Sequence, residues 1–255
     1  DGLSGLNWVA ATTARQRVVI AGDPVTNRTD SRLRTNSAAA PEPGDWTATA
    51  RAAGLLVGDA ELPRLAFAQS EMDAVEKALM DFDVLRLSGF DATRERVTKE
   101  LESADLGHVT AHGFADFERP RASGLALSFW ERNGATTDGF LRFEQIGNLR
   151  LHTRLVTLSA CDTSLGRVTS AYSVPSLANA LLRAGARRVV SALWKVDDAA
   201  TAELMKHFYR NLFSQERMTP GQALWRAQMT VKSQKRWRHP YYWAGFQLSG
   251  DWRPL

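Results

Sequence analysis

The chain has 255 residues, 44% of them hydrophobic and 24% charged, which are ordinary proportions for a globular protein and exclude a wholly disordered chain, a collagen and a coiled coil. No apolar run approaches the ~20 residues that span a bilayer, so we expect no membrane contact. The net charge of +4 is too small to indicate direct binding of nucleic acid. The single cysteine excludes an intrachain disulfide and a four-cysteine zinc site, and we expect a reducing, cytoplasmic location.

Short runs rich in valine, leucine and alanine predict the strands of a sheet. The predicted strands cover residues 17–21, 84–87, 106–111, 125–130, 155–160, 188–193 and, at the edge of the sheet, 242–248. Between the first two strands, residues 25–64 show little periodicity and include an Ala-, Pro- and Ser-rich segment. We expect a flexible loop there, within a single domain that covers residues 1–255.

Apolar residues spaced three and four apart predict helices between these strands. The predicted helices cover residues 70–82, 91–102, 176–184, about 198–212 and a segment that begins at Pro220. We expect Asp91 to cap the second helix, Asp197 or Asp198 to cap the fourth, and Gly185 to end the third. The alternation of strands and helices predicts an α/β fold of three layers, with a mostly parallel central sheet and helices on both faces.

Two reactive side chains come directly after predicted strands. His112 follows the strand 106–111, and Cys161 follows the strand 155–160. If these parallel strands are neighbours, their carboxyl ends bring the imidazole and the thiol to one edge of the sheet. The imidazole can then take the thiol proton, and the thiolate can attack a carbonyl carbon. No third residue is evident, so we expect a dyad, with the backbone N–H groups of Gly113 and Cys161 stabilising the oxyanion.

Other interpretations of these residues remain open at this point. A lone cysteine after a buried strand is usually an inert core residue, and only its combination with His112 favours catalysis. His108 lies deeper in its strand, and we expect it to be packed or supporting. Two histidines four apart in a strand do not suit a metal site. Phosphate-binding glycine loops and a Gly-x-Ser-x-Gly turn are absent from the sequence, so we expect no cofactor and no serine hydrolase.

Longer segments around these residues carry a resemblance to a known family. They are 108–113 (HVTAHG), 123–127 (SGLAL), 158–163 (LSACDT), 185–198 (GARRVVSALWKVDD) and 240–246 (PYYWAGF). Together they resemble the CHAT domain family of caspase-like cysteine peptidases, whose wider group includes caspases and separase. The resemblance is nearly continuous from about residue 65 to 250. It implies a caspase-like fold, with Cys161 as the nucleophile and His112 as the base.

The resemblance also implies a substrate-binding pocket. Ser159 faces the same side of its strand as the nucleophile, and in caspase-like enzymes that position lines the pocket for the residue before the cut bond. By analogy with separase, Asp197 or Asp198 pairs with an arginine or lysine of the substrate, and helix capping is the alternative role for either aspartate. Asp162 is expected to orient the loop after the nucleophile. Trp194 would line the pocket if it were apolar.

These features predict a cysteine endopeptidase that cleaves a specific protein substrate after a basic residue. The resemblance favours a bacterial effector protease that is activated by a partner or by an upstream sensor domain such as helical repeats. The chain begins with Asp1 rather than Met, as expected of an excised domain. A catalytically silent, caspase-like interaction module is the alternative. Basic residues gather around 232–238, where we expect a solvated helix end, and the helical spacing of Trp225 places it in the predicted core.

Overall fold

The computed structural model describes residues 15–27, 29–33, 62–114, 123–160, 176–194 and 196–255. Its central sheet has the strand order β2-β1-β3-β6-β7-β8. The strands β1, β2, β3, β6 and β7 pair in parallel, and β8 joins the edge antiparallel to β7. These strands are β1 (Arg17–Pro24), β2 (Asp83–Gly89), β3 (Leu106–Phe114), β6 (Leu155–Ala160), β7 (Arg188–Ala192) and β8 (Phe246–Gly250). Two short strands, β4 (Gly124–Ala126) and β5 (Phe140–Arg142), extend the end of β3 as an antiparallel pair.

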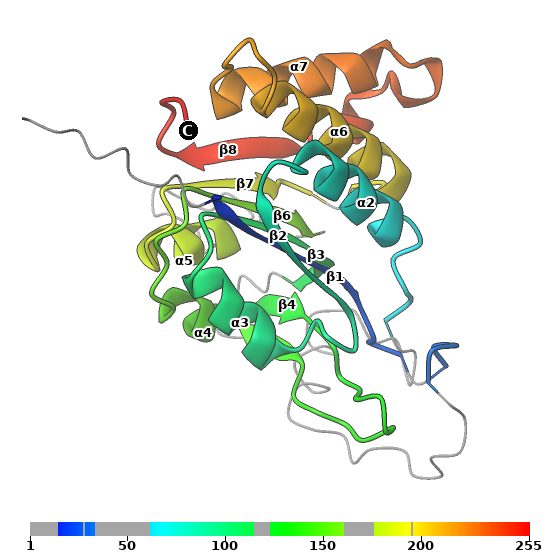
Figure 1. Cartoon of the computed structure of the whole chain (residues 1–255). Coiled ribbons are helices and arrows are strands. Elements are labelled where there is room, and N and C mark those ends of the chain that lie inside the picture. Colours follow the sequence, from blue (N-terminus) through cyan, green and yellow to red (C-terminus); the bar gives the residue numbers. More distant parts are fainter. Residues whose placement is uncertain (1–14, 28, 34–61, 115–122, 161–175, 195) are drawn as a thin grey trace, which may run out of the picture.

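Helices cover both faces of the sheet, as Figure 1 shows. One face carries α2 (Ala68–Ala78), α6 (Asp198–Leu212) and α7 (Pro220–Ser233), and the other carries α3 (Arg94–Glu102), α4 (Phe143–Gly147) and α5 (Leu177–Arg183). Two 3-10 turns, Lys235–Trp237 and Pro240–Tyr242, lead into β8. The three-layer α/β fold expected from the sequence is therefore confirmed. Among the described residues, no helix has the length and apolar character needed to cross a membrane.

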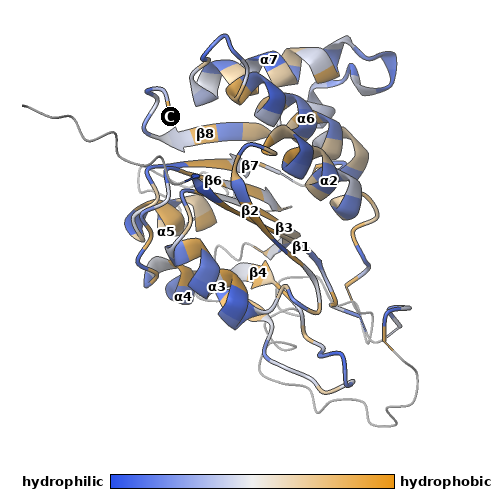
Figure 2. Cartoon of the chain, viewed as in Figure 1, coloured by the Kyte–Doolittle hydropathy of each residue, from blue (hydrophilic) through white to orange (hydrophobic). Residues whose placement is uncertain are grey.

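Successive side chains of each strand point to opposite faces of the sheet, so the protein has a hydrophobic core on each face. In β1, Val18 and Ile20 pack into the cluster beneath α2 and α6, whereas Val19 and Ala21 pack into the cluster above α3 and α5. All four side chains are buried, because a central strand with helices on both faces is hydrophobic on both faces. Figure 2 shows the same arrangement, with hydrophobic residues concentrated in the strands and hydrophilic residues on the outer side of α3.

Most predicted helices and strands are confirmed, but several of them begin or end at other residues than predicted. Thr93 caps α3, so the expectation for Asp91 was wrong; the Thr93 hydroxyl accepts a hydrogen bond from the Arg96 backbone N–H. The predicted strand 125–130 is shorter in the structure, and β5 and α4 were not predicted. The predicted last strand begins only at Phe246, because the residues before it form 3-10 turns.

Two further expectations meet different outcomes. Trp225 was expected in the core, but its side chain is 62% exposed on the outer side of α7, so that prediction was wrong. Of the predicted loop 25–64, residues 34–61 lie outside the described part of the chain. Its two ends are packed, since Val25 and Leu62 are buried in a small cluster with Phe114.

Candidate functional site

The two strands that precede the predicted catalytic residues are neighbours. β3 and β6 run in parallel, and Ala111 lies opposite Ala160, the last residue of β6. His112 therefore follows directly at the carboxyl edge of the sheet, half-buried. Cys161 and Asp162 lie outside the described residues. The structure thus confirms the neighbouring strands on which the predicted pairing depends.

The imidazole of His112 is oriented by a backbone oxygen. Its Nε2 lies 2.7 Å from the carbonyl oxygen of Pro63. A carbonyl oxygen only accepts, so Nε2 carries the hydrogen, and the basic lone pair of a neutral ring is then on Nδ1. Sequence reasoning missed this partner, because any residue type supplies a backbone oxygen and no pattern marks it.

Hydrogen bonds around the buried carboxylate of Asp23 fix the segment that carries Pro63. We call the residues involved the Asp23 cluster: Asp23, Arg32, Arg64 and Gln69. Both carboxylate oxygens of Asp23 accept hydrogen bonds from Arg64, at 2.7 and 2.6 Å. Arg32 and Gln69 donate to the same carboxylate at 2.8 and 2.6 Å. The hydrogen bond with Asp23 raises the pKa of Arg64. Asp23 has a φ of +47°, which aspartate adopts more readily than most residues.

A narrow cavity opens beside the ends of β3 and β6. Its volume is about 10 Å³, which is room for about one water molecule. Its lining comes from β3, β6, the start of α6, and α2 with the segment before it. The lining residues are Leu65, Phe67, Ala68, Glu71, Thr110, Ala111, Ser159, Val196, Asp198 and Thr201.

The structure separates the two candidate aspartates. Asp197 caps α6, and its side chain accepts a hydrogen bond of 2.9 Å from the Ala200 backbone N–H. Asp198 is in the first turn of the helix and lines the cavity together with Ser159. Trp194 instead donates its indole N–H to the carbonyl oxygen of Tyr241, 3.1 Å away. Its ring therefore packs toward the C-terminal segment.

Below the cavity lies a buried network around His108, which is fully buried, as the sequence led us to expect. Its Nδ1 lies 3.2 Å from the hydroxyl of Tyr209, and that hydroxyl donates to Thr157 at 2.9 Å. Its Nε2 lies 2.9 Å from the Thr110 hydroxyl and 3.1 Å from Oε1 of Glu71. His108 thus has a packing role, and the network joins α2 and α6 to the sheet.

Two other expectations can be placed. Gly113 lies opposite Leu125 of β4, directly after His112, so its backbone belongs to the edge where the cavity opens. Within the described residues, no group of His, Cys, Asp and Glu side chains is arranged to bind a metal ion.

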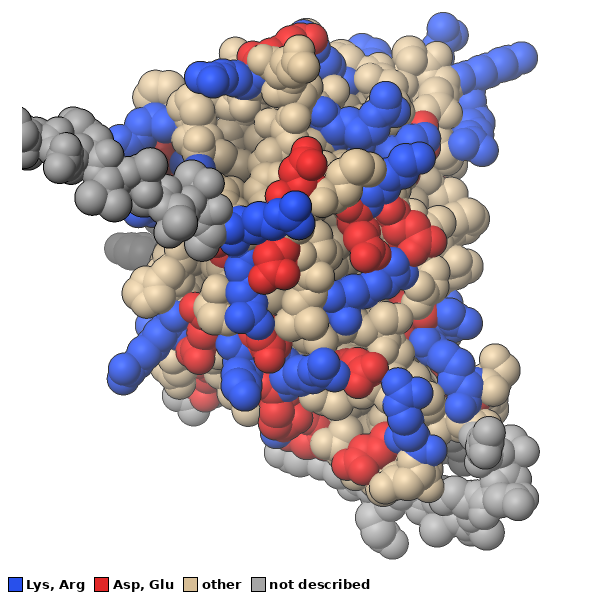
Figure 3. Space-filling model, viewed as in Figure 1, with Lys and Arg blue, Asp and Glu red and all other residues tan. Residues whose placement is uncertain are grey.

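The basic stretch near the C-terminus is partly packed. Trp237 is buried, and the guanidinium of Arg236 stacks 3.6 Å from the centre of its ring. On the face shown in Figure 3, basic and acidic side chains are interspersed, and no stripe of one sign crosses that face.

Comparisons with known proteins agree with this geometry. Tetratricopeptide repeat protein 28 of mouse is 40% identical and its human counterpart 38% identical over 104 residues, which are 41% of this chain and only 4% of those much longer proteins. The structure of the Arg-specific cysteine proteinase gingipain R matches 93% of this chain and 46% of its own, with a TM-score of 0.55 and 12% identity. A complex of the pro- and mature domains of Porphyromonas gingivalis RgpB matches similarly, over 93% and 47% of the chains, with a TM-score of 0.54 and 13% identity.

The likeness to these structures confirms the caspase-like fold. The sequence profile of the CHAT domain matches residues 3–251, nearly the whole chain. This chain therefore belongs to the CHAT domain family.

Proposed function

We propose that the protein is a cysteine endopeptidase in which His112 activates Cys161. The observation that carries the proposal is the position of His112: it lies at the carboxyl edge of the sheet, directly beside the end of β6, and Pro63 fixes its ring. Cys161 is the next residue after β6 in the sequence. Membership of a family of caspase-like peptidases and the presence of both reactive residue types support the same conclusion.

The chemistry follows from the orientation of the ring. Nδ1 of His112 takes the proton of the Cys161 thiol, and the thiolate attacks the carbonyl carbon of the scissile peptide. The backbone N–H groups of Gly113 and Cys161 stabilise the oxygen that becomes negative. The imidazolium then returns its proton to the leaving amine, and water hydrolyses the thioester. The Pro63 oxygen stabilises the positive ring between these steps through a charge-assisted hydrogen bond.

The side chain before the cut bond lies at the end of β6, near Ser159 and Asp198. Asp198 supplies a negative charge there, whereas Asp197 is used as a helix cap. An arginine or lysine of the substrate is therefore the preferred residue. Trp194 and Asp162 are assigned no direct part in this contact.

Control of the peptidase belongs to a partner or to a neighbouring domain. The relatives from mouse and human are named tetratricopeptide repeat proteins, and the present chain corresponds to a small part of them. We infer that helical repeats, in the same chain or in a partner, regulate this domain. We further infer that it acts on a protein substrate as a bacterial effector in a reducing compartment, where its thiol remains available.

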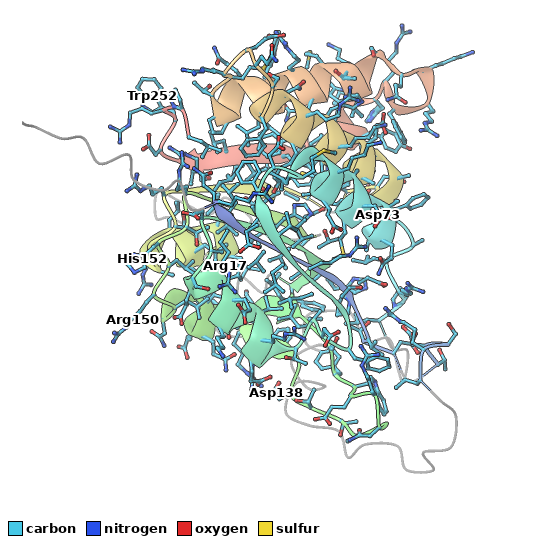
Figure 4. All side chains as sticks on the ribbon, in the orientation of Figure 1. Arg17, Asp73, Asp138, Arg150, His152 and Trp252 are labelled. Atoms are coloured by element: carbon cyan, nitrogen blue, oxygen red, sulfur yellow. The ribbon has the colours of Figure 1, made fainter. Side chains whose placement is uncertain are left out.

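Covalent labelling tests the proposal directly. A peptide acyloxymethyl ketone with arginine next to the electrophile should add to the wild-type protein at Cys161, as located by mass spectrometry of the digested product. The adduct should be absent in Cys161→Ala and strongly reduced in His112→Ala. His152→Ala is the matched control, since His152 is exposed at another part of the surface (Figure 4). Equal labelling of wild type and His112→Ala would instead favour the catalytically silent interaction module.

A further inference from the structure

We propose that the outer edge of β2 binds an extended, basic segment of a partner protein, which adds to the sheet as a further strand. β2 is the first strand in the order of the sheet, and within the described residues it pairs only with β1. β1 lies between β2 and β3, the strand that carries His112. This edge is therefore apart from the proposed catalytic site, and the inference goes beyond the proposed function.

The backbone of β2 has unpaired polar groups along its outer edge. The N–H of Asp83 donates to the carbonyl oxygen of Gln16, just before β1, so Asp83 and every second residue after it face β1. Val84 and Arg86 therefore direct their N–H and C=O groups to the free side of the strand. Within the part of the chain that the structure describes, these four groups have no hydrogen-bond partner. An added strand would satisfy them in the way that β1 satisfies the other side.

β2 lacks the features that usually protect an edge strand from pairing. Its sequence, DVLRLSG, contains neither proline nor lysine. Its one cationic side chain, Arg86, is directed to α2, where it donates to Asp73 (Figure 4) at 2.6 Å and to Glu76 at 2.7 Å. The edge is therefore available for pairing with another strand.

An open groove lies beside this edge, on the side of the sheet that carries α2. It exists because α2 packs over β1: a Cβ placed on Gly22 of β1 would lie 2.8 Å from Sδ of Met72 on the helix. The groove has a volume of about 490 Å³, which is room for several side chains. We call it the β2 groove, and its lining residues are Asp73, Glu76, Lys77, Met80, Phe82 and Val84.

The β2 groove has an apolar part that an added strand can cover. The side chain of Met80 is 66% exposed, and Phe82 and Val84 are only partly buried. In a strand added beside Val84, every second side chain points to the face of the sheet on which the groove lies. Apolar residues at these positions would remove Met80, Phe82 and Val84 from water.

The charge around the β2 groove favours a basic partner. The groove and the residues next to it carry two basic side chains, Lys77 and Arg86, and four acidic ones, which are Asp73, Glu76, Asp81 and Asp83. Asp81 and Asp83 are exposed and form no ion pair within the described residues. Because the whole chain has a net charge of +4, this negative surface is a local feature that attracts cations. Asp83 faces the side of β2 opposite to the groove, so basic residues that alternate with apolar ones suit both faces.

Binding of a model strand tests the inference. The probe is a fluorescein-labelled peptide of seven residues that alternates lysine and valine, and the protein is the full chain with Cys161→Ala, which cannot cleave the probe through the thiol. We expect fluorescence anisotropy to give a micromolar Kd, and the same peptide with glutamate in place of lysine to bind at least about 10-fold more weakly. Hydrogen exchange followed by NMR should show that the Val84 amide becomes protected when the lysine peptide binds.

Two substitutions at one position separate backbone pairing from side-chain contact. Val84→Pro removes the outward N–H without breaking a hydrogen bond to β1, and it should weaken binding about 10-fold. Val84→Ala keeps the N–H and should weaken binding by no more than about 3-fold. Circular dichroism and thermal melting establish that each variant is folded.

A charge reversal provides a second variant in case Val84→Pro unfolds. Asp83→Lys should weaken binding about 5-fold at low salt and less at high salt, because exposed charges are screened. Glu216→Lys is the matched control, since Glu216 pairs with Arg226 of α7 and is not part of the β2 groove. This variant has the same change in net charge and should bind the peptide as the parent protein does.

The outcomes distinguish the possible occupants of the edge. Protection of the Val84 amide, with loss of affinity in Val84→Pro and in Asp83→Lys, supports a basic added strand. Absence of binding, equal affinity for the lysine and glutamate peptides, or unchanged affinity in folded Val84→Pro and Asp83→Lys proteins would overturn the inference. In analytical ultracentrifugation, a dimer that Val84→Pro dissociates would assign the edge to a second copy of the chain and reject the basic partner. None of these results depends on labelling of Cys161, so the peptidase proposal stands or fails separately.

Discussion

Nε2 of His112 and the carbonyl oxygen of Pro63, 49 residues apart in the sequence, lie 2.7 Å from each other. The residue after Pro63 is Arg64, whose guanidinium forms two hydrogen bonds with the buried carboxylate of Asp23. Asp23 lies near the end of β1, which is the neighbour of β3. The orientation of the imidazole thus depends on an ion pair between two elements that contain no part of the proposed dyad.

Replacing Asp23 with Asn should therefore weaken catalysis through His112. The substitution keeps the shape but removes the charge that fixes Arg64, and the segment with Pro63 loses its anchor. We expect kcat for a peptide substrate to fall about 10-fold or more, because the imidazole is no longer held in one orientation. A loss of about 1 kcal/mol in the free energy of unfolding should accompany it, because the hydrogen bonds to the buried carboxylate weaken while Arg64 stays partly exposed to water.

Asp138→Asn provides the comparison for this variant. Asp138 pairs with Arg94 and Arg142 at another part of the surface (Figure 4). Its substitution should leave kcat unchanged. A folded Asp23→Asn protein with wild-type kcat would show that the cluster does not position His112.

The two aspartates at the start of α6 should respond differently to substitution. Asp197→Ala removes a helix cap and should cost about 1 kcal/mol of stability, with no change in the preference for arginine over citrulline. Asp198→Asn should reduce that preference, measured as the ratio of cleavage rates for two peptides that differ only by arginine or its uncharged analogue citrulline before the cut bond. Thermal melting and the two peptide rates, measured on both variants, check the assignment. A loss of preference in Asp197→Ala alone would reverse the roles that we give them.

The buried phenol of Tyr209 should make the free energy of unfolding decrease at alkaline pH. Burial raises the pKa of Tyr209 above its ordinary value of 10.0, and the negative charge of Glu71 raises it further. The unfolded chain releases the phenol proton near that ordinary value, whereas the folded chain retains it, so the folded state binds more protons and its stability falls as the pH rises above about 10.

The variant Tyr209→Phe isolates this effect. At neutral pH it should be less stable than wild type by about 1–3 kcal/mol, because His108 and Thr157 lose a buried partner. The difference should shrink as the pH rises above about 10, since only wild type loses stability through this residue. Urea unfolding at neutral and alkaline pH measures both quantities. A difference that is constant with pH would show that Tyr209 ionises alike in the folded and unfolded chains.

Gly185 should be intolerant of a side chain. Its φ is +114°, and a Cβ there would lie 2.1 Å from the carbonyl oxygen of Leu151. Gly185→Ala should therefore lower the free energy of unfolding by more than ~1 kcal/mol. Gly147→Ala is the natural comparison, because nothing lies within 4 Å of a Cβ at that position, and it should be neutral or slightly stabilising. Urea unfolding measures both variants, and equal midpoints for Gly185→Ala and Gly147→Ala would contradict this prediction.

The sequence predicted the parts of the molecule that have a strong local pattern. The strand Leu155–Ala160 has the same bounds in the structure, and Asp197 and Gly185 act at the helix ends as expected. The element β5 was missed because three residues are too few to show a period. Trp225 was misplaced because helical spacing alone does not say which face of a helix is covered.

The site was predictable only where a residue type carries its chemistry. His112 was found from its position after a strand, whereas the pairing of β3 with β6 was only a condition of the prediction and is seen in the structure. The Pro63 oxygen is a backbone group and leaves no mark in the sequence. Its position is set by tertiary structure.

Strand β3 changes partner at one residue. Up to Ala111 it is paired with β6, and from His112 onward it is paired with β4. The imidazole is thus attached where β3 leaves the central sheet and joins the short antiparallel strands β4 and β5. The orientation of the ring is therefore determined jointly by the central sheet and by the short antiparallel strands beside it.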